Sequence, residues 1–195
     1  AQSSHFWGSA IPNIMTVLGS VVVLDDTGGI LRFLVDGGTL TSRLNYANIR
    51  PVKFELNPIF VTRIKLVDLL QRRVRIGLIG GSTTQDFIIF ENDAAGAAVN
   101  WFGRTNKGGT GSSVDLSLLA TTNFLYLAIV GDNDNNAVMF LTRGDVRSPW
   151  VIGGTLAANI PTVRLQPYWE LVNNNVAQHT FVLDSYYTYM DDAEI

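Results

Sequence analysis

The 195-residue chain contains no cysteine, which excludes disulfides, zinc–thiolate sites and cysteine nucleophiles. Charged residues are also scarce, because Asp, Glu, Lys and Arg make up only 16% of the chain, against about 25% in ordinary soluble domains. Two interpretations of this deficit stay open. Either the surface is built from neutral polar residues, or other subunits cover much of it.

Lysine is rare, and Lys53, Lys65 and Lys107 are the only lysines among 14 basic residues. The arginines suit interfaces, because a planar guanidinium both pairs and stacks, although genome base composition explains the same bias. The net charge of −3 disfavours nucleic acid, so no nucleic-acid partner is expected.

Long apolar runs are missing as well. No run approaches the roughly 20 residues that a membrane-spanning helix needs, so no membrane partner is expected. The first residues, AQSSHFWGSAIP, lack a basic region followed by an apolar core, so no signal peptide is expected.

The chain does contain many short apolar runs separated by polar, glycine-rich breaks. Five of them begin between Val74 and Leu141: VRIGLIG, DFIIFEN, AVNWFGRT, NFLYLAIV and AVMFLTR. Each has the length of a strand, so the stretch is predicted to form a meander that buries one face of a sheet. The predicted partner strands are Val52–Leu56, Ile59–Val67, Thr162–Val172 and Ala177–Met190.

Further strands are predicted near the N-terminus and further loops near the centre. The β-branched run Thr16–Leu24 and the runs Ile30–Val35 and Thr39–Leu44 are separated by Gly-Gly and Asp-Gly steps that favour hairpins. Asn106–Ser113 (NKGGTGSS) is predicted to be a long flexible loop, and Arg143–Ala158 a glycine-bearing connection.

About a dozen short strands, with turn signals every 8–12 residues and no long amphipathic helix, predict an all-β fold. The expected architecture is a two-sheet antiparallel β-sandwich over residues 17–190. Residues 1–16 are expected to form an extended arm and residues 191–195 a tail. Phe6 and Trp7 would anchor the arm, either on the domain's own sheet or at an interface with a neighbouring subunit.

The strand rhythm resembles the concanavalin A-like (laminin G-like) jelly rolls of tailed-bacteriophage virion proteins. The resemblance covers roughly two-thirds of the chain and is carried by VKFEL, RRVRIGLIG, FIIFEND, VNWFGRT, FLYLAIV, VMFLTRG, NIPTVRLQPYWELVNNN and FVLDSYY. It implies two packed antiparallel sheets and a virion role in capsid decoration, a head fibre or the tail surface.

Two acidic segments are candidates for chemistry. Glu91-Asn92-Asp93 is similar to the paired-carboxylate run of jelly-roll glycosidases, but Ala95 or Gly96 stands where the second glutamate belongs, so a turn is predicted. Asp132, Asp134 and Asn136 have the spacing of calcium-loop ligands. Ala137 and Arg143 replace the required glycine and acid, and this segment too is interpreted as a turn. No metal and no cofactor are expected.

Aromatic residues are the better candidates for binding. Trp101, Trp150, Tyr168 and Trp169 are predicted to contact a ligand such as a glycan, because aromatic faces stack on sugar rings. The same side chains could instead fill the core or a subunit interface. Tyr186 and Tyr187 point to opposite faces, so at most one is core. His179 is predicted to face solvent, and no Ser-His-Asp spacing is found.

These observations favour a non-enzymatic virion structural protein that assembles with itself and with other virion proteins. Its expected location is the virion, assembled in the host cytoplasm. A carbohydrate-binding or receptor-binding module, recognising a host surface glycan, is the alternative. A glycoside hydrolase is the remote one.

Overall fold

The computed structural model describes residues 2–4, 15–18, 20–23, 31–35, 41–46, 51–69, 71–81, 85–94, 99–173 and 178–191. Strands dominate these residues. The bounds are β1 Gln2–Ser4, β2 Met15–Leu18, β3 Ser20–Val23, β4 Leu31–Val35, β5 Thr41–Tyr46, β6 Ile59–Leu66, β7 Arg72–Ile79, β8 Phe87–Ala94, β9 Asn100–Lys107, β10 Thr110–Leu119, β11 Phe124–Asp132, β12 Ala137–Arg143, β13 Val151–Leu156, β14 Gln166–Asn173 and β15 His179–Tyr189, with one 3-10 helix, η1, at Phe54–Leu56. No helix among these residues is long and apolar enough to cross a membrane.

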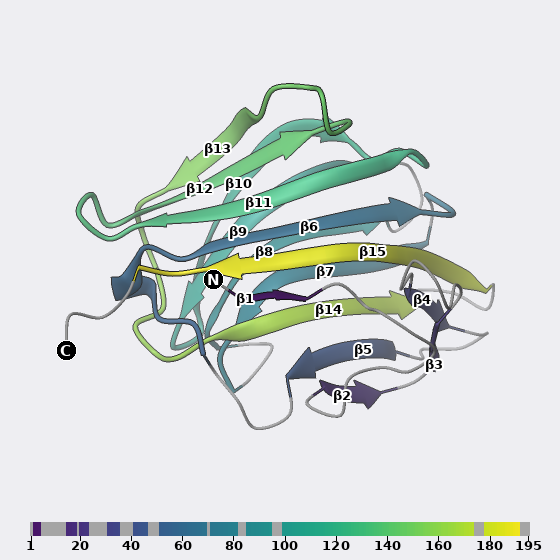
Figure 1. Cartoon of the computed structure of the whole chain (residues 1–195), viewed down its shortest axis with the longest axis horizontal. Coiled ribbons are helices and arrows are strands. Elements are labelled where there is room, and N and C mark those ends of the chain that lie inside the picture. Colours follow the sequence, from purple (N-terminus) through teal and green to yellow (C-terminus); the bar gives the residue numbers. More distant parts are fainter. Residues whose placement is uncertain are drawn as a thin grey trace.

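The described strands form two antiparallel sheets that pack face to face (Figure 1). Sheet A has the order β13-β12-β11-β6-β15-β4-β3, with β1 also paired to β15. Sheet B has the order β10-β9-β8-β7-β14-β5-β2. The predicted fold class, a two-sheet antiparallel β-sandwich, is confirmed.

Strict alternation along the strands places the core between the sheets. In β6, every second residue from Phe60 to Leu66 is buried, while Val61, Arg63 and Lys65 are partly exposed. Successive side chains of a strand point to opposite faces, so one apolar face suffices to dock the sheet. In sheet B, Trp101 and Trp169 supply the two largest fully buried side chains.

The predicted single meander over Val74–Leu141 is wrong, because its strands divide between the two sheets. β7, β8 and β9 belong to sheet B, whereas β11 and β12 belong to sheet A. Between them runs β10, the edge strand of sheet B, after which the chain crosses to sheet A. Period-2 patterning shows that a strand has one buried face, but not which sheet it joins.

The predicted strand Val52–Leu56 is also wrong. Val52 forms only an isolated bridge with Leu165, and η1 follows directly. Asn57 ends the helix in the left-handed region (φ 45°), and its backbone N–H donates to the Phe54 carbonyl. Asparagine tolerates this conformation better than most residues, so a left-handed residue cuts short the apparent alternation.

The predicted long loop Asn106–Ser113 is instead a tight hairpin. Lys107 pairs with Thr110 across Gly108 and Gly109, which both have positive φ. A two-residue turn with two positive φ values matches the twist of antiparallel strands. The polar residues that follow are therefore strand β10, which sequence patterning missed because most of its side chains are exposed.

The predicted strand Thr16–Leu24 and the predicted connection Arg143–Ala158 also need correction. The run Thr16–Leu24 is described as two strands in different sheets, β2 in sheet B and β3 in sheet A. The predicted connection Arg143–Ala158 contains an edge strand, β13, whose two glycines pack against β10 side chains. Gly154 could not carry a Cβ without meeting Val114 at 2.8 Å.

Part of the predicted arm lies on the domain itself, since Gln2–Ser4 pairs with Tyr186–Thr188 of β15. Phe6 and Trp7, the predicted interface residues, lie outside the described residues. At the other end, the Asp191 backbone N–H donates to the Leu56 carbonyl, and residues 192–195 lie outside the described part.

Candidate functional site

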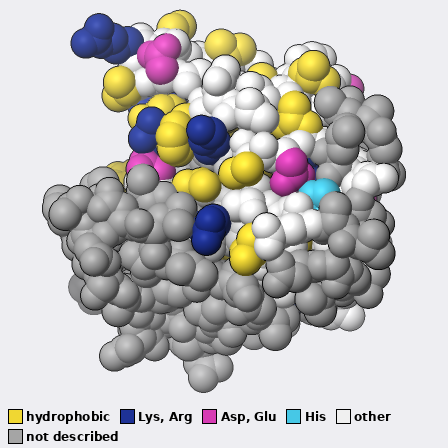
Figure 2. Space-filling model, turned by 90° about the vertical axis from the view of Figure 1, so that its right-hand side faces the viewer, with side chains coloured by type: hydrophobic (Ala, Val, Ile, Leu, Met, Phe, Trp, Pro, Cys, Tyr) yellow, Lys and Arg dark blue, Asp and Glu magenta, His cyan; other side chains and the backbone are white. Residues whose placement is uncertain are grey.

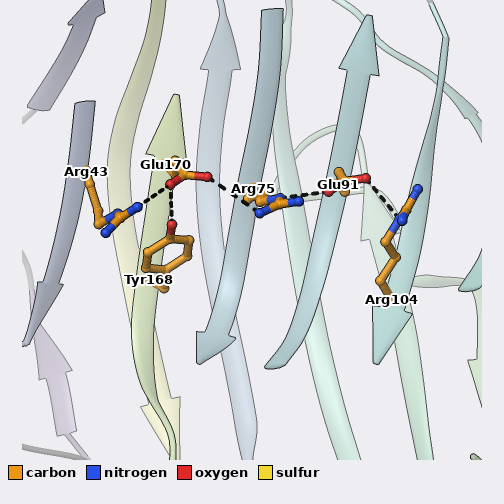
Figure 3. A network of polar contacts seen from close by, with 6 residues as sticks. All are labelled: Arg43, Arg75, Glu91, Arg104, Tyr168 and Glu170. Carbon is orange, nitrogen blue, oxygen red and sulfur yellow. Dashed lines mark hydrogen bonds and ion pairs between the residues drawn. The ribbon is translucent and has the colours of Figure 1, made fainter. Parts of the chain in front are cut away.

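The face of sheet B that points away from the core carries a row of alternating charges. Cross-strand register aligns Arg43 of β5, Glu170 of β14, Arg75 of β7 and Glu91 of β8. Arg104 of β9 lies one step diagonally from Glu91, opposite Ile89. Together with Tyr168 these residues form the outer-face network (Figure 3).

Short contacts connect the whole row. Arg43 Nη2 donates to Glu170 Oε2 at 2.7 Å, and Tyr168 Oη donates to the same oxygen at 2.5 Å. Arg75 Nε donates to Glu91 Oε2 at 2.7 Å, while its Nη1 lies 3.9 Å from Glu170 Oε1. Arg104 Nε lies 2.9 Å from Glu91 Oε1 as an ion pair. Both oxygens of Glu91 are thus engaged by arginines.

Burial explains why the charges must alternate. The Glu91 and Glu170 side chains are each only 4% exposed, and a buried carboxylate is costly unless it is paired. Each glutamate has an arginine on both sides across the sheet, so the network leaves no buried carboxylate without a neighbouring cation. The prediction of a turn at Glu91-Asn92-Asp93 is therefore wrong: these residues lie inside β8, held by partners on adjacent strands.

Tyr168 belongs to this network and presents no open stacking face. It is fully buried in a small apolar cluster with Ile79, Phe87 and Ile89, and the Arg43 guanidinium lies 5.5 Å from its ring centroid. Burial and then the neighbouring Glu170 carboxylate raise the pKa of Tyr168 above its ordinary value. The phenol therefore keeps its proton and donates a hydrogen bond to Glu170.

The outer face opens toward β9 and β10. Arg104, the most exposed member of the network, has 42% of its side chain accessible. Beside it is a hollow of about 230 Å³ lined by Phe87, Arg104, Thr105, Asn106, Gly111, Ser112 and Ser113. The Phe102 ring, 6.0 Å from the Arg104 guanidinium, is partly exposed on the same side. We name this region the β9–β10 patch.

The other predicted ligand-binding residues lie elsewhere. Trp101 and Trp169 are fully buried in the main core, where Trp169 packs edge-on against Tyr186 at 4.7 Å. Neither indole can meet a ligand from this position, so their location does not support the prediction. Tyr186 is buried and Tyr187 is not, as expected from alternation.

Trp150 is the predicted ligand-binding residue that does lie near the surface. It precedes β13 and packs edge-on against Tyr126, with ring centroids 6.4 Å apart. The Arg143 guanidinium lies 4.6 Å from the Trp150 ring and 4.5 Å from the Tyr126 ring. On the far side of Tyr126, Arg63 lies 4.0 Å from the Phe124 ring. Sheet A therefore carries an arginine–aromatic stack on its outer face.

The acidic loop after β11 folds as the predicted turn. The Asn135 backbone and side-chain amides donate to the two Asp132 carboxylate oxygens, and Asn136 adopts φ 46°. These hydrogen bonds lower the pKa of Asp132. Within the described residues, no group of three or more His, Cys, Asp or Glu side chains is placed to hold a metal ion.

The prediction that His179 faces solvent is wrong, because the residue is only 5% exposed. Its Nδ1 lies 2.8 Å from Asp68 Oδ1, and the Asp68 carbonyl accepts a hydrogen bond from Arg72 Nε. Arg72 is fully buried and donates to Asn92 Oδ1 at 2.7 Å. Burial lowers the pKa of Arg72 to about 10. These contacts tie strands and loops together at one end of the sandwich.

Sequence reasoning missed the arginines and Glu170 of the outer-face network. The available signal was period-2 charge, since Arg73 and Arg75 alternate with Val74 and Ile76. That pattern marks one polar strand face. It does not reveal that the neighbouring strands carry the complementary carboxylates.

No family model and no curated protein matches the chain. Several solved structures, however, are similar to the chain in fold. A Bacillus licheniformis β-glucanase matches with a TM-score of 0.69 and 12% identity over 98% of this chain and 99% of that one. A Lotus tetragonolobus seed lectin matches with a TM-score of 0.65 and 11% identity over 98% and 100%.

A third similar structure is the CBM2 module of the evolved Dit of Lactobacillus casei BL23 phage J-1. It matches with a TM-score of 0.63 and 13% identity over 98% of this chain and 96% of that one. At such identities the likeness concerns the fold alone. The chain has the concanavalin A-like jelly-roll fold that these lectin and glucanase structures share.

Proposed function

We propose that this chain is a non-catalytic carbohydrate-binding domain whose ligand lies on the β9–β10 patch. The observation that carries the proposal is the composition of the patch. Arg104 offers donors and Ser113 a hydroxyl to sugar hydroxyls, and the partly exposed Phe102 ring offers a face to the sugar C–H groups. Lectins and a carbohydrate-binding module of the same fold support it.

The outer-face network explains why the domain would bind without cleaving. A glycosidase of the usual type needs two carboxyl groups flanking the scissile bond. Glu91 has both oxygens engaged by Arg75 and Arg104. Glu170 lies two strands away, on the far side of Arg75, so an arginine occupies the space between the two carboxylates.

Glycan-array screening followed by calorimetry with the best ligand tests the proposal. Arg104→Ala should weaken binding at least about tenfold, because hydrogen bonds to a charged group contribute about 1.5–3 kcal/mol. Phe102→Ala should weaken it as well. Arg147→Ala is the matched control, since Arg147 is an exposed arginine on the loop before β13, away from the patch.

Two results would count against this function. If no glycan binds, or if Arg104→Ala binds as tightly as the parent, the patch is not the ligand site. If the protein hydrolyses a β-glucan and Glu91→Gln abolishes the activity, the domain is a glycoside hydrolase instead.

A second candidate function is that of a virion structural protein, which one observation favours. The phage Dit module shares the fold over nearly the whole chain, and the strand rhythm resembles phage modules. The partners would then be a second copy of the chain and other virion proteins, with a host surface glycan as ligand. Light scattering tests the self-assembly. A monomer that also fails to associate with virion proteins would contradict this candidate.

A further inference from the structure

A second hollow lies apart from both the β9–β10 patch and the core. It measures about 1070 Å³ and lies at the end of the sandwich where β11 begins and β12 ends. Residues of the loop before β13 form one wall, including Asp145, Val146 and Ser148. Figure 2 looks onto this end of the molecule, where basic and apolar side chains lie side by side.

Two arginines of the arginine–aromatic stack, Arg63 and Arg143, line this hollow. They differ in their partners. Arg63 Nη1 forms an ion pair with Asp184 Oδ2 at 2.9 Å. Arg143 donates one hydrogen bond, from Nη1 to the Val146 carbonyl at 3.2 Å, and has no ion pair within the described residues.

Arg143 is nevertheless held in place. Its guanidinium is in contact range of the Tyr126 and Trp150 rings, and its buried Nε has no hydrogen-bond partner among the described residues. Because stacking on the aromatic rings already fixes the orientation of the guanidinium, little side-chain entropy is lost when a ligand binds to it. A fixed cation without a carboxylate partner is suited to bind an anion.

The nearest acidic group of the hollow is occupied by its own loop. The Asp145 carboxylate accepts hydrogen bonds from the Arg147 and Ser148 backbone N–H groups and from Ser148 Oγ. The Asp145 carboxylate also interacts electrostatically with the Arg143 guanidinium, which contributes to lowering the pKa of Asp145. Asp145 therefore offsets part of the Arg143 charge without forming an ion pair with it.

The remaining lining combines polar and apolar groups. Ser117, Thr121 and Asn123 supply hydroxyl and amide groups, whereas Val151 and Ile152 are more than half exposed and form an apolar wall. Polar groups beside an apolar surface match a saccharide, which has hydroxyls around its edge and C–H groups on its faces.

We propose that this hollow binds an oxyanion-bearing saccharide, with Arg143 holding its carboxylate or phosphate group. The saccharide part rests on the proposed carbohydrate-binding function. The anion part rests on Arg143 alone. The site is separate from the β9–β10 patch, because it lies at the sandwich end beside sheet A and shares no lining residue with the patch.

Calorimetry with three probes tests the inference: glucuronate, glucose 6-phosphate and neutral glucose. At least one acidic sugar should bind more tightly than glucose, and the two acidic arms distinguish a carboxylate ligand from a phosphate ligand. Arg143→Gln should weaken that binding at least about tenfold. Arg147→Gln is the matched control, because it removes the same charge from an exposed position outside the lining. It should leave binding within about twofold, since exposed charges are screened near 0.15 M salt.

A second variant guards against a purely structural effect of losing the stack. Asp145→Asn keeps a carbonyl oxygen for the loop hydrogen bonds but removes the charge that opposes an anion. It should tighten binding, whereas a misfolded loop would loosen it. Thermal unfolding of each variant shows that the comparison is made between folded proteins.

The inference is overturned if glucose binds as tightly as both acidic sugars. It is equally overturned if neither acid binds, if folded Arg143→Gln binds like the parent, or if Arg147→Gln loses as much affinity. Arg104→Ala separates the two proposals. It should weaken binding at the β9–β10 patch at least about tenfold and leave the acidic sugar bound. If no glycan on the array binds but glucuronate binds in an Arg143-dependent way, only the proposal of a ligand site at the β9–β10 patch is refuted.

Discussion

Replacing Glu91 by Gln removes the central carboxylate of the outer-face network while keeping the length and shape of the side chain. Arg75 and Arg104 both lose their charged partner. Arg75, with only 18% of its side chain exposed, keeps just the Glu170 oxygen at 3.9 Å. The neutral amide can still accept one hydrogen bond, so the change is electrostatic more than steric.

The expected cost follows from the burial of the partners. Breaking a fully buried ion pair by removing one member costs about 3–5 kcal/mol, and an exposed pair contributes about 0–1 kcal/mol. Glu91 is buried, Arg75 is mostly buried and Arg104 is 42% exposed. We therefore expect the free energy of unfolding to fall by about 1.5–3 kcal/mol.

Urea unfolding at pH 7 measures this change. Glu55→Gln is the control, because Glu55 is exposed on η1 and should change stability by less than about 0.5 kcal/mol. In double-mutant cycles, Glu91 should couple more strongly to Arg75 than to the more exposed Arg104. If Glu91→Gln lowers the free energy of unfolding no more than Glu55→Gln does, the ion pairs of Glu91 contribute nothing to stability. The cost expected from the burial of these charges is then refuted.

Three further changes test other parts of the molecule. Gly103→Ala should destabilise by about 1–3 kcal/mol in urea unfolding, because its Cβ would lie 2.5 Å from the buried Phe140 ring; unchanged stability would show that the ring moves freely. Gly109→Ala should cost about 1 kcal/mol, since φ is 92° and the site is otherwise open; a stabilised variant would refute the strained turn. Burial and Glu170 raise the pKa of Tyr168, so its contribution to stability is complete below the ordinary pKa of 10.0 and is lost as pH rises above it. Tyr168→Phe should therefore lower stability at pH 7 and reduce the fall in stability above pH 10, and an identical alkaline fall in both proteins would contradict this.

Local patterning predicted much of the sandwich because one face of each buried strand is apolar. The strand Ala137–Arg143 was predicted with the bounds of β12, and the alternation of Ile59–Val67 with nearly the bounds of β6. The opposite placement of Tyr186 and Tyr187 also follows from period 2 alone. Such inferences need only the neighbouring residues in the chain.

The failures share a different cause. The first half of β10 is polar and glycine-bearing because the strand lies at a sheet edge, and its apolar alternation is confined to Val114, Leu116 and Leu118. Glu91 looked like a turn residue because its arginine partners come from β7 and β9, and His179 looked exposed because its partner Asp68 is 111 residues away. Polar groups become predictable as buried only when their distant partners are known.

The candidate site was predicted least well. Trp101 and Trp169 have the residue type of a sugar-stacking platform, yet core and surface tryptophans cannot be told apart by type. Trp150 lies near the hollow that Arg143 lines and packs against Arg143, but it does not itself line the space. Binding surfaces depend on which loops meet, and no local pattern carries that information.

The position of the last two strands bears on how the domain is made. β14 and β15 follow every other described strand in the chain, yet each lies in the middle of its sheet, between β7 and β5 and between β6 and β4. During synthesis neither sheet can be completed until β14 and β15 have left the ribosome. Until then β6 and β7 remain unpaired edges, and their charged residues Arg63, Lys65, Arg73 and Arg75 would deter edge-to-edge aggregation. Folding should therefore begin only once β14 and β15 have been made, and it should be slow, as for other sandwiches dominated by long-range pairing.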